Sequence, residues 1–445
     1  MTSDPPREPS GLLVRLGLHR PELRAWAMYD WANSGFVLAI QTAIFPLWFH
    51  AQAGGEGIGT LRLAWTTTIA LALVALAAPF LGALADYAGL KKRMLGTFVG
   101  IGVTATACLW FVREGDWMTA AILFGAANIG AQASFVFYDS LLPHIAGPRE
   151  MDRVSTAGYA IGYFGSTLLF LLLISWITWP EAFGLGSRST ATRAGFVAVA
   201  VWWLLFTLPL LLRVREPRPR IEPDERPGEN PARVALTRLA QTFRELRLYR
   251  HAFLMLIAFI VYNDGIGTII RMAGPYGKDL GFPDGSLMVA ILIPQIVGIP
   301  FAFLFGALAG RIGPKRSIFL GLAAYAGITT YAFFLQSLAE FFVLAALVGM
   351  VQGGTQALSR SLFASLIPTH KSAEFFSFYG VLDKFAGMLG PMFFATTAQM
   401  TGSNRYGILS LIVFFVAGGL ILSRVDVAEG RRAAREAEAM AAPGT

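Results

Sequence analysis

The stretch Gly82-Ala-Leu-Ala-Asp86-Tyr87-Ala-Gly89-Leu-Lys91-Lys92 recurs 224 positions later as Gly306-Ala-Leu-Ala-Gly310-Arg-Ile-Gly313-Pro-Lys315-Arg316, in a chain of 445 residues. Each copy follows a long apolar run and ends in a cluster of basic residues. This arrangement is typical of a tight cytoplasmic turn between two membrane-spanning helices. A duplication at this spacing divides the chain into related halves, which is the organisation of a transporter built from two helical bundles.

The composition indicates an integral membrane protein. Hydrophobic residues make up 55% of the chain, charged residues 14%, and the mean hydropathy is +0.56, well above the balance of a soluble domain. A helix of about 20 apolar residues crosses the hydrocarbon core of a bilayer. The apolar runs predict an all-α fold with twelve spanning helices in two pseudo-symmetric six-helix bundles, at residues 26–49, 63–85, 94–112, 118–141, 154–178, 194–212, 252–272, 286–309, 316–336, 340–362, 374–398 and 406–424.

Further residue pairs support the duplication. Gln132 and Gln356 are 224 positions apart, and Gly165 and Gly390 are 225 positions apart. These spacings make the fourth and tenth predicted helices counterparts, and likewise the fifth and eleventh.

Lysine and arginine residues are distributed unequally between alternate loops. With the N-terminus inside, 28 of the 36 basic residues fall on the inner side and 7 on the outer side, while Lys384 lies within a span. Because short cytoplasmic loops retain Lys and Arg, both termini are predicted to be cytoplasmic. The net charge of +8 then reflects topology and contact with anionic membrane lipids. No segment is long enough for a folded basic surface, so nucleic acid is not an expected partner.

The predicted domains are a cytoplasmic tail (1–25), an N-terminal bundle (26–212), a cytoplasmic linker (213–250), a C-terminal bundle (251–424) and a cytoplasmic tail (425–445). In the linker, Val234, Leu239, Phe243 and Leu246 recur at helical spacing. This spacing predicts a short amphipathic helix on the inner membrane surface. A connector that sets the spacing of the halves is the simplest role for it.

Catalytic chemistry is not indicated. The sequence lacks a Gly-x-x-x-x-Gly-Lys-Ser/Thr loop, which argues against an ATP-driven pump. The five histidines are scattered over loops and helix ends, so no metal site is expected. Cys108 is the single cysteine, and no intramolecular disulfide can form. The sequence therefore predicts a protein that is not an enzyme and needs no cofactor. A monomer is the expected oligomeric state.

The duplicated stretch has a physical rationale. Gly82 and Gly89 permit close packing and a tight turn, Asp86 can cap a helix or pair with a cation, and the basic cluster anchors the turn. These residues resemble the signature loop of the major facilitator superfamily, which joins helices two and three and recurs in degenerate form between helices eight and nine. In that family the acidic residue helps to hold one conformation, so the resemblance implies gating roles for Asp86, Lys91 and Arg93.

Two departures from the signature weaken its expected charge network. Tyr87 stands where an arginine is usual, and Gly310 replaces the acidic residue in the second copy. A reduced set of ion pairs is therefore expected at this loop.

Other stretches narrow the resemblance. They are Trp26-Ala-Met-Tyr-Asp30-Trp-Ala-Asn33-Ser34, Tyr262-Asn263-Asp264-Gly265, Gln352-Gly-Gly-Thr-Gln356-Ala-Leu-Ser359-Arg360-Ser361, and residues 158–165 and 374–379. Together they are similar to the vacuole amino-acid effluxer branch of the superfamily, which includes a fungal autophagy-related transporter and bacterial members. The resemblance spans nearly the whole chain and implies the major facilitator fold, a bacterial member and an amino-acid substrate.

Polar residues near the bilayer midplane are the candidate substrate-binding residues, because such transporters bind substrate where the halves meet. Lys384 lies about ten residues, roughly 15 Å, into helix eleven, where an uncompensated amine costs at least about 2.5 kcal/mol. Asp264 lies slightly past the middle of helix seven. The remaining candidates are Asn33, Asn128, Gln132, Tyr262, Asn263, Gln352 and Gln356, with Tyr159 and Tyr163 as further cavity residues. Asp30, Asp139 and Arg360 lie nearer the cytoplasmic ends and suit an inner gate.

Structural roles stay open for these residues. Lys384 can pair with Asp383 or with a carbonyl, and Asp264 can mark a local helix break. Asp30 can be an acid favoured at a helix start by the macrodipole. The glutamines can be interhelical hydrogen-bonding residues, and Arg360 can extend its charged end to the membrane surface or pair at a gate.

The sequence predicts secondary active transport by alternating access. A zwitterion such as a neutral amino acid would place its carboxylate at Lys384 and its ammonium at Asp264 or the midplane glutamines, with protonation of Asp264 or Asp30 as the link to a proton gradient. Two alternatives stay open: a transporter of a lipid, amphiphile or drug-like compound, and a non-transporting receptor or assembly factor. Short loops without an Asn-x-Ser/Thr sequon favour a bacterial inner membrane.

Overall fold

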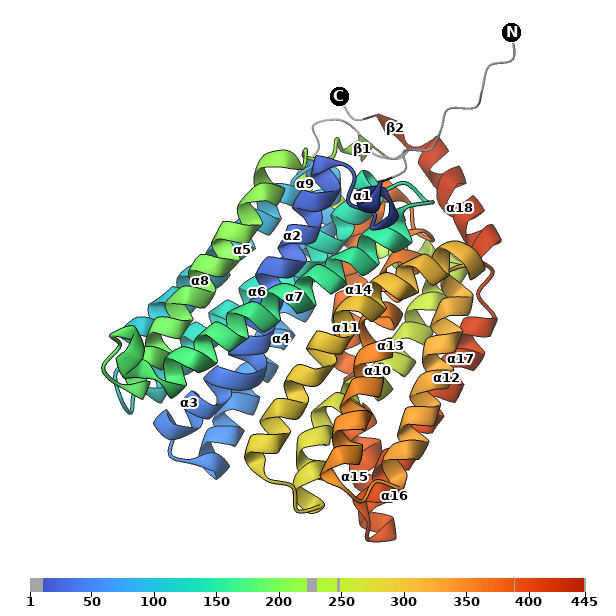
Figure 1. Cartoon of the computed structure of the whole chain (residues 1–445). Helices are drawn as coiled ribbons and strands as arrows, with labels where there is room; N and C mark the ends of the chain where they lie inside the picture. Colours follow the sequence, from blue (N-terminus) through green and yellow to red (C-terminus); the bar gives the residue numbers. More distant parts are fainter. Residues whose placement is uncertain (1–10, 222–229, 246–248, 388, 444–445) are drawn as a thin grey trace.

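The computed structural model describes residues 11–221, 230–245, 249–387 and 389–443. Figure 1 shows two helical bundles side by side, α2 to α8 and α10 to α17. In the described ranges the strands are β1 (Arg220–Ile221) and β2 (Ala442–Pro443), which form one short antiparallel pair. The prediction of an all-helical fold in two bundles is confirmed.

The N-terminal bundle has six long segments. They are α2 (Pro21–Phe36) continued by η1 (Val37–Ala43) and α3 (Ile44–Gln52), then α4 (Glu56–Ala88), α5 (Lys91–Cys108), α6 (Trp117–Ile145), α7 (Met151–Thr178) and α8 (Arg188–Arg213). Shorter pieces are α1 (Leu12–Arg15), η2 (Leu109–Phe111) and η3 (Pro180–Phe183). The first long helix begins five residues before the predicted start at residue 26, because a proline at the first helical position is compatible with a helix start.

The C-terminal bundle repeats this plan, and its eleventh and twelfth spans are each made of two helices. It contains α10 (Arg250–Asp279), α11 (Asp284–Ile312), α12 (Pro314–Phe333), α13 (Leu338–Ala364), η4 (Thr369–Lys371), α14 (Ser372–Ala386), α15 (Leu389–Thr401), α16 (Asn404–Ser410) and α17 (Ile412–Ser423). The prediction of one continuous helix over 374–398 is wrong. Glycines at 387 and 390 weaken a helix at this point, and contacts from α10 hold the two ends apart, as shown below.

Ten helical segments in the described part of the chain are long and apolar enough to cross a membrane. The two predicted spans outside this set are α12 and the α14–α15 pair. α12 is 20 residues long, which is about 30 Å of helix, and it packs against α13 and α17 inside the bundle. α14 and α15 are 15 and 13 residues long, so each alone is too short, and together they have the length of one span.

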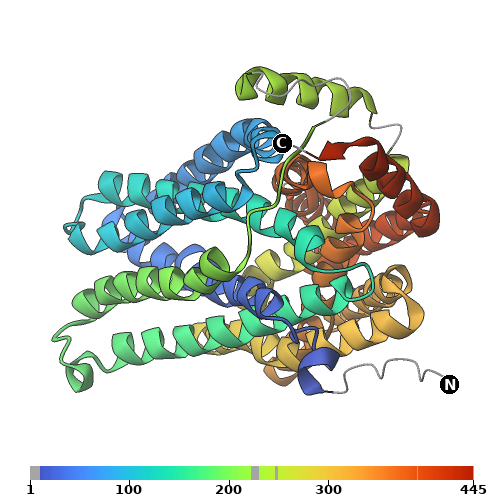
Figure 2. The ribbon, with the colours of Figure 1, turned by 90° about the horizontal axis from the view of Figure 1, so that it is seen from above.

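Both ends of the described chain lie at the same end of the molecule, where Figure 1 shows α1 and β2. We call this the inner end, because the distribution of charge predicts that it faces the cytoplasm. Two further helices lie there: α9 (Pro231–Glu245), which packs on α4, and α18 (Val427–Met440). Seen from above in Figure 2, the described segment after α8 runs across the molecule, and α9 lies at its edge. A helix is present in the predicted linker, and Val234 on it is buried. The side chains of Leu239, Phe243 and Leu246 lie outside the described residues, and the place of this helix on the membrane surface stays a prediction.

Each bundle is tightly packed. In the N-terminal bundle a Cβ atom at Gly130 would lie 2.6 Å from the backbone of Gly102 on α5. In the C-terminal bundle a Cβ atom at Gly354 would lie 2.2 Å from the ring of Phe305. Real Cβ atoms do not approach so closely, so glycine is required at these crossings. Close packing of this kind lets each bundle move as a unit, which is how domains rotate about an interface.

Candidate functional site

A buried arginine joins the two bundles. Arg360 on α13 donates from Nη2 to Asp30 Oδ2 on α2 (3.2 Å) and from Nη1 to Asp139 Oδ1 on α6 (3.1 Å). Its Nε also donates to Ser155 Oγ on α7 at 2.9 Å. Arg360 is 4% exposed and Asp30 is 6% exposed. A guanidinium of the C-terminal bundle is therefore held by three helices of the N-terminal bundle.

Aromatic rings surround this guanidinium. Its carbon lies 4.8 Å from the ring centroid of Trp26 and 4.7 Å from that of Tyr159. The hydroxyl of Tyr138 donates to Asp30 Oδ2 at 2.8 Å. The rings favour a cation over their faces and exclude water. With both carboxylates ionised, Arg360 leaves the group one negative charge in excess, so a single proton makes it neutral.

The signature loop makes a second connection between the bundles. Asp86, at the end of α4, pairs with Lys91 Nζ at 2.7 Å. Its carboxylate also accepts from the backbone N–H groups of Ala373 (3.2 Å) and Glu374 (2.8 Å) at the start of α14. Lys91 Nζ donates to Ser372 Oγ at 2.8 Å. Asp86 thus caps a helix of the opposite bundle, where the positive end of the helix dipole favours an anion.

The linker packs on the same loop. Glu216 accepts from the backbone N–H groups of Lys92 (2.8 Å) and Arg93 (3.2 Å), and so caps the start of α5. Arg238 on α9 is fully buried, and its guanidinium carbon lies 5.5 Å from the ring centroid of Tyr87. Tyr87 replaces the arginine that is usual at this position, and the linker brings the guanidinium of Arg238 next to it. Arg93, for which the family resemblance implies a gating role, has an exposed side chain.

Further hydrogen bonds close the inner end. Ser155 Oγ donates to the carbonyl of Ala357 (2.7 Å), and Ser361 Oγ donates to Asp152 Oδ1 (2.6 Å). These bonds again join α7 to α13. Packing is equally close, since a Cβ atom at Gly82 would lie 2.6 Å from the carbonyl oxygen of Ala373. The structure is thus closed at its inner end, whereas Figure 1 shows the ribbons of the two bundles diverging toward the outer end.

Several predicted substrate-site residues meet in the middle of the C-terminal bundle. Gln356 Nε2 on α13 donates to Asn263 Oδ1 on α10 at 3.1 Å. The hydroxyls of Tyr262 and Ser359 share a hydrogen bond. Gln352, one turn before Gln356, is half-buried. The structure therefore brings α10 and α13 together through polar side chains at mid-height.

The N-terminal bundle carries a corresponding group. Asn33 Nδ2 donates to the Tyr29 hydroxyl at 3.0 Å, and that hydroxyl donates to Ser134 Oγ at 2.6 Å. Nearer the outer end, Gln41 Nε2 on η1 donates to Asn128 Oδ1 on α6 at 2.7 Å. Gln132 lies half-buried on α6 between these pairs. Sequence reasoning missed Gln41, which lies in a π-helical segment, and π-helical turns are common at functional sites.

The structure does not place the charged groups of Asp264 and Lys384 together in a substrate site. Asp264 is 4% exposed, and its carboxylate accepts from the backbone N–H of Gly390 at 2.7 Å. It is thus already bonded within the protein. Lys384 belongs to α14, but its side chain lies outside the described residues. Its role stays a prediction.

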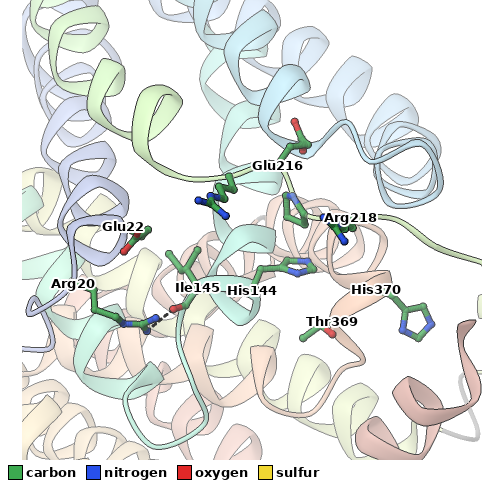
Figure 3. A pocket seen from close by; sticks show the side chains of 10 residues that line it. Arg20, Glu22, His144, Ile145, Glu216, Arg218, Thr369 and His370 are labelled. Carbon is green, nitrogen blue, oxygen red and sulfur yellow. Dashed lines mark hydrogen bonds between the residues drawn. The ribbon is translucent and has the colours of Figure 1, made fainter. Parts of the chain in front are cut away.

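A cavity of about 400 Å³ opens at the inner end. Figure 3 shows its lining, which comes from α2, α6, the linker and the residues before α14. Arg20 Nη2 donates to the carbonyl of Ile145 at its edge, at 2.7 Å. The lining residues are Arg20, Glu22, His144, Ile145, Arg215, Glu216, Pro217, Arg218, Thr369 and His370. None of the predicted substrate-site residues is among them.

Comparison with known proteins gives one consistent result. A family model described as vacuole effluxer Atg22 like matches residues 63–435. The uncharacterized MFS-type transporter YxiO of Bacillus subtilis (strain 168) is 38% identical over 406 residues, covering 90% of this chain and 94% of that protein. Autophagy-related protein 22 of Coccidioides immitis (strain RS) is 25% identical over 465 residues, covering 87% of this chain and 76% of that protein.

The fold matches solved structures as well. The major facilitator superfamily transporter FucP, in its outward conformation, superposes with a TM-score of 0.68 at 12% identity. The match covers 92% of this chain and 99% of that chain. The predicted twelve-helix architecture is therefore that of a known transporter fold.

Proposed function

Because the chain belongs to the Atg22-like family of major facilitator superfamily transporters, we propose that it moves small zwitterions, above all neutral amino acids, by alternating access. The observation that carries the proposal is the closure of the inner end by Arg360, which joins two pseudo-symmetric bundles. The bacterial relative and the inner excess of basic residues support a bacterial inner membrane with both termini in the cytoplasm.

The place where the bundles are joined supports alternating access. Arg360, Asp86 and Ser155 all make their cross-bundle bonds near the inner end. A rotation that separates these groups opens the inner end, and the same rotation brings the outer ends together. The described conformation is then the outward-facing one, and release of the Arg360 and Asp86 contacts leads to the inward-facing one.

The substrate site is proposed at mid-height between the bundles. Lys384 offers a cation for the substrate carboxylate, and a cation at this depth needs an anionic or polar partner. Gln352 and Gln356 on α13, with Gln132 on α6, offer amide oxygens for the substrate ammonium group. The internal hydrogen bond from Gly390 to Asp264 favours these amides over Asp264 as the ammonium partner.

Proton coupling is proposed at the inner gate. In the closed form, one guanidinium serves two carboxylates, the buried Asp30 and the partly buried Asp139. When Arg360 withdraws, the carboxylates lose their cation, and binding one proton reduces the charge left behind. A proton taken up at this step and released on closure would link the transport cycle to a proton gradient.

Reconstituted transport tests the proposal. Purified protein in liposomes is assayed with a panel of labelled amino acids, with and without an inward proton gradient. Lys384→Ala is compared with Lys278→Ala, which removes an exposed lysine from the outer end of α10. Saturable uptake that is lost in Lys384→Ala and kept in Lys278→Ala supports the proposal.

Two results would contradict it in different ways. Saturable uptake that survives Lys384→Ala would show that the site model is wrong while amino-acid transport stands. No uptake under any gradient, by protein whose melting temperature in liposomes matches that of the freshly purified protein, would refute the substrate class. The search would then move to lipids and other amphiphiles.

A further inference from the structure

The eleventh spanning segment is divided at mid-height. α14 ends at Ala386 and α15 begins at Leu389. Counting from its inner start at Ser372, the division lies about 22 Å along the helix. Inside a membrane, the carbonyl groups at the end of one half-helix and the N–H groups at the start of the next need partners from the protein.

One helix supplies both partners. On α10, Asp264 Oδ2 accepts from the N–H of Gly390 at 2.7 Å, at the start of α15. Two turns later, Arg271 Nη2 donates to the carbonyl of Gly387 at 2.9 Å, just beyond the end of α14. The same Arg271 nitrogen lies 3.4 Å from Asp264 Oδ1. The anion therefore meets the positive end of one half-helix, and the cation meets the negative end of the other.

The fit around these contacts is tight. A Cβ atom at Gly390 would lie 2.1 Å from Thr268 Oγ1 and 3.0 Å from Asp264 Oδ1. Glycine at 390 thus lets α15 approach α10 closely enough for the hydrogen bond to Asp264 to form. The Asp264 side chain is 1% exposed, whereas the Arg271 side chain is 46% exposed. One member of the pair is fixed in the protein, and the other can be reached from its surface.

The counterpart in the N-terminal bundle is not divided. Gly165 corresponds to Gly390 in the duplication, and it lies inside the continuous helix α7. There a Cβ atom would meet the ring of Trp31 on α2 at 2.6 Å. The close approach of the two helices is therefore kept in both halves, while the division and the charged pair belong to the C-terminal half alone. In transporters built from repeats, discontinuous helices near the midplane commonly form the transport path, and the division between α14 and α15 lies at that depth.

We propose that Asp264 and Arg271 form a clamp that holds α14 and α15 in line, and that α15 is the moving outer gate of the transport cycle. The gating part rests on the proposed transport function, whereas the clamp itself is tested without any substrate. Asp264 and Arg271 are positioning residues: they set where α15 lies and do not contact the substrate. Opening of the clamp frees α15 to swing toward the N-terminal bundle.

Pulsed electron paramagnetic resonance tests the clamp directly. Spin labels are placed at Met400→Cys near the outer end of α15 and at Phe334→Cys just after α12, both exposed positions, in a Cys108→Ala background. The distance distribution between them is compared for the parent, Asp264→Ala, Arg271→Gln and the double variant. Asp279→Asn is the matched control, since it removes a carboxylate that accepts from Asn404 farther along the same helix.

The clamp predicts a broadened and shifted distribution in Asp264→Ala and in Arg271→Gln, and no larger change in the double variant. The control keeps the parent distribution. Asp264→Asn retains one acceptor oxygen for Gly390, so it gives an intermediate result and serves if Asp264→Ala fails to fold. In transport assays, Asp264→Asn lowers the turnover rate at least tenfold and changes KM less than twofold.

Three outcomes overturn the proposal. Unchanged distributions in both single variants would show that neither residue positions α15. Additive changes in the double variant would show two independent contacts rather than a clamp. A higher KM for Asp264→Asn with an unchanged distribution would place Asp264 in the substrate site. The first two outcomes can be read whether or not amino acids are the substrate, because the distances are measured without any. The third needs a transported substrate.

Discussion

Replacing Arg360 by glutamine tests the inner gate. The substitution leaves the buried Asp30 and the partly buried Asp139 without their cation. Removing one partner from a buried ion pair costs about 3–5 kcal/mol. The cost falls only on the conformation in which the inner end is closed, because the bundles separate these groups when it opens. At about 1.4 kcal/mol per factor of ten, the equilibrium shifts toward the inward-open form by roughly two to three and a half orders of magnitude.

A cysteine reporter measures this shift. Ala373, at the contact between α14 and α4, is fully buried in the closed form, so Ala373→Cys in a Cys108→Ala background reacts with a membrane-impermeant maleimide only when the inner end opens. We expect fast labelling in Arg360→Gln and slow labelling in the matched control Arg311→Gln, which removes an exposed arginine of the same inner end. Adding Asp30→Asn and Asp139→Asn to Arg360→Gln restores slow labelling. Labelling of Arg360→Gln at the parent rate would refute the reasoning.

Other substitutions probe the inner closure and the contact between α15 and α10. Gly82→Val places side-chain atoms where Ala373 O lies 2.6 Å from a Cβ position, so the reporter is labelled quickly and uptake falls at least tenfold; normal closure would show that α4 and α14 do not need this contact. Asp86→Asn removes the ion pair to Lys91 and keeps acceptor capacity for one N–H of α14, so labelling rises less than in Arg360→Gln; a larger rise would make the loop the dominant lock. Gly390→Val prevents α15 from approaching Thr268 and lowers the melting temperature by several degrees, since overpacking costs about 1–3 kcal/mol; an unchanged melting temperature would contradict the tight fit.

The fold could be predicted from the sequence because membrane spans leave strong patterns. Apolar runs of about 20 residues, the distribution of Lys and Arg, and the repeated loop around Gly82 and Gly306 all indicate the two bundles. The division between α14 and α15 could not be predicted in this way. Glycine is common in spanning helices, and it is the side chains of Asp264 and Arg271, from a distant part of the chain, that stabilise the two helix ends.

Only part of the candidate site could be predicted from the sequence. Asp30, Asp139 and Arg360 were placed at one depth by counting residues, but their meeting around one guanidinium depends on the packing of three helices. Counting assigned Arg271 to the outer side, although it lies two helical turns after Asp264 on the same face of α10, a spacing that could have linked the two. Lys384 stays a prediction, since its side chain lies outside the described residues.

The packing of Arg238 on Tyr87 bears on how such chains can be recombined. The linker is more than a spacer here, because it brings a guanidinium to the loop position where Tyr87 stands in place of an arginine. A chimaera that took its linker from a relative would exchange part of this loop's environment along with the spacer. In a collection of related chains, a tyrosine at this loop position should be inherited together with a basic residue on the linker helix, and the two should be lost together.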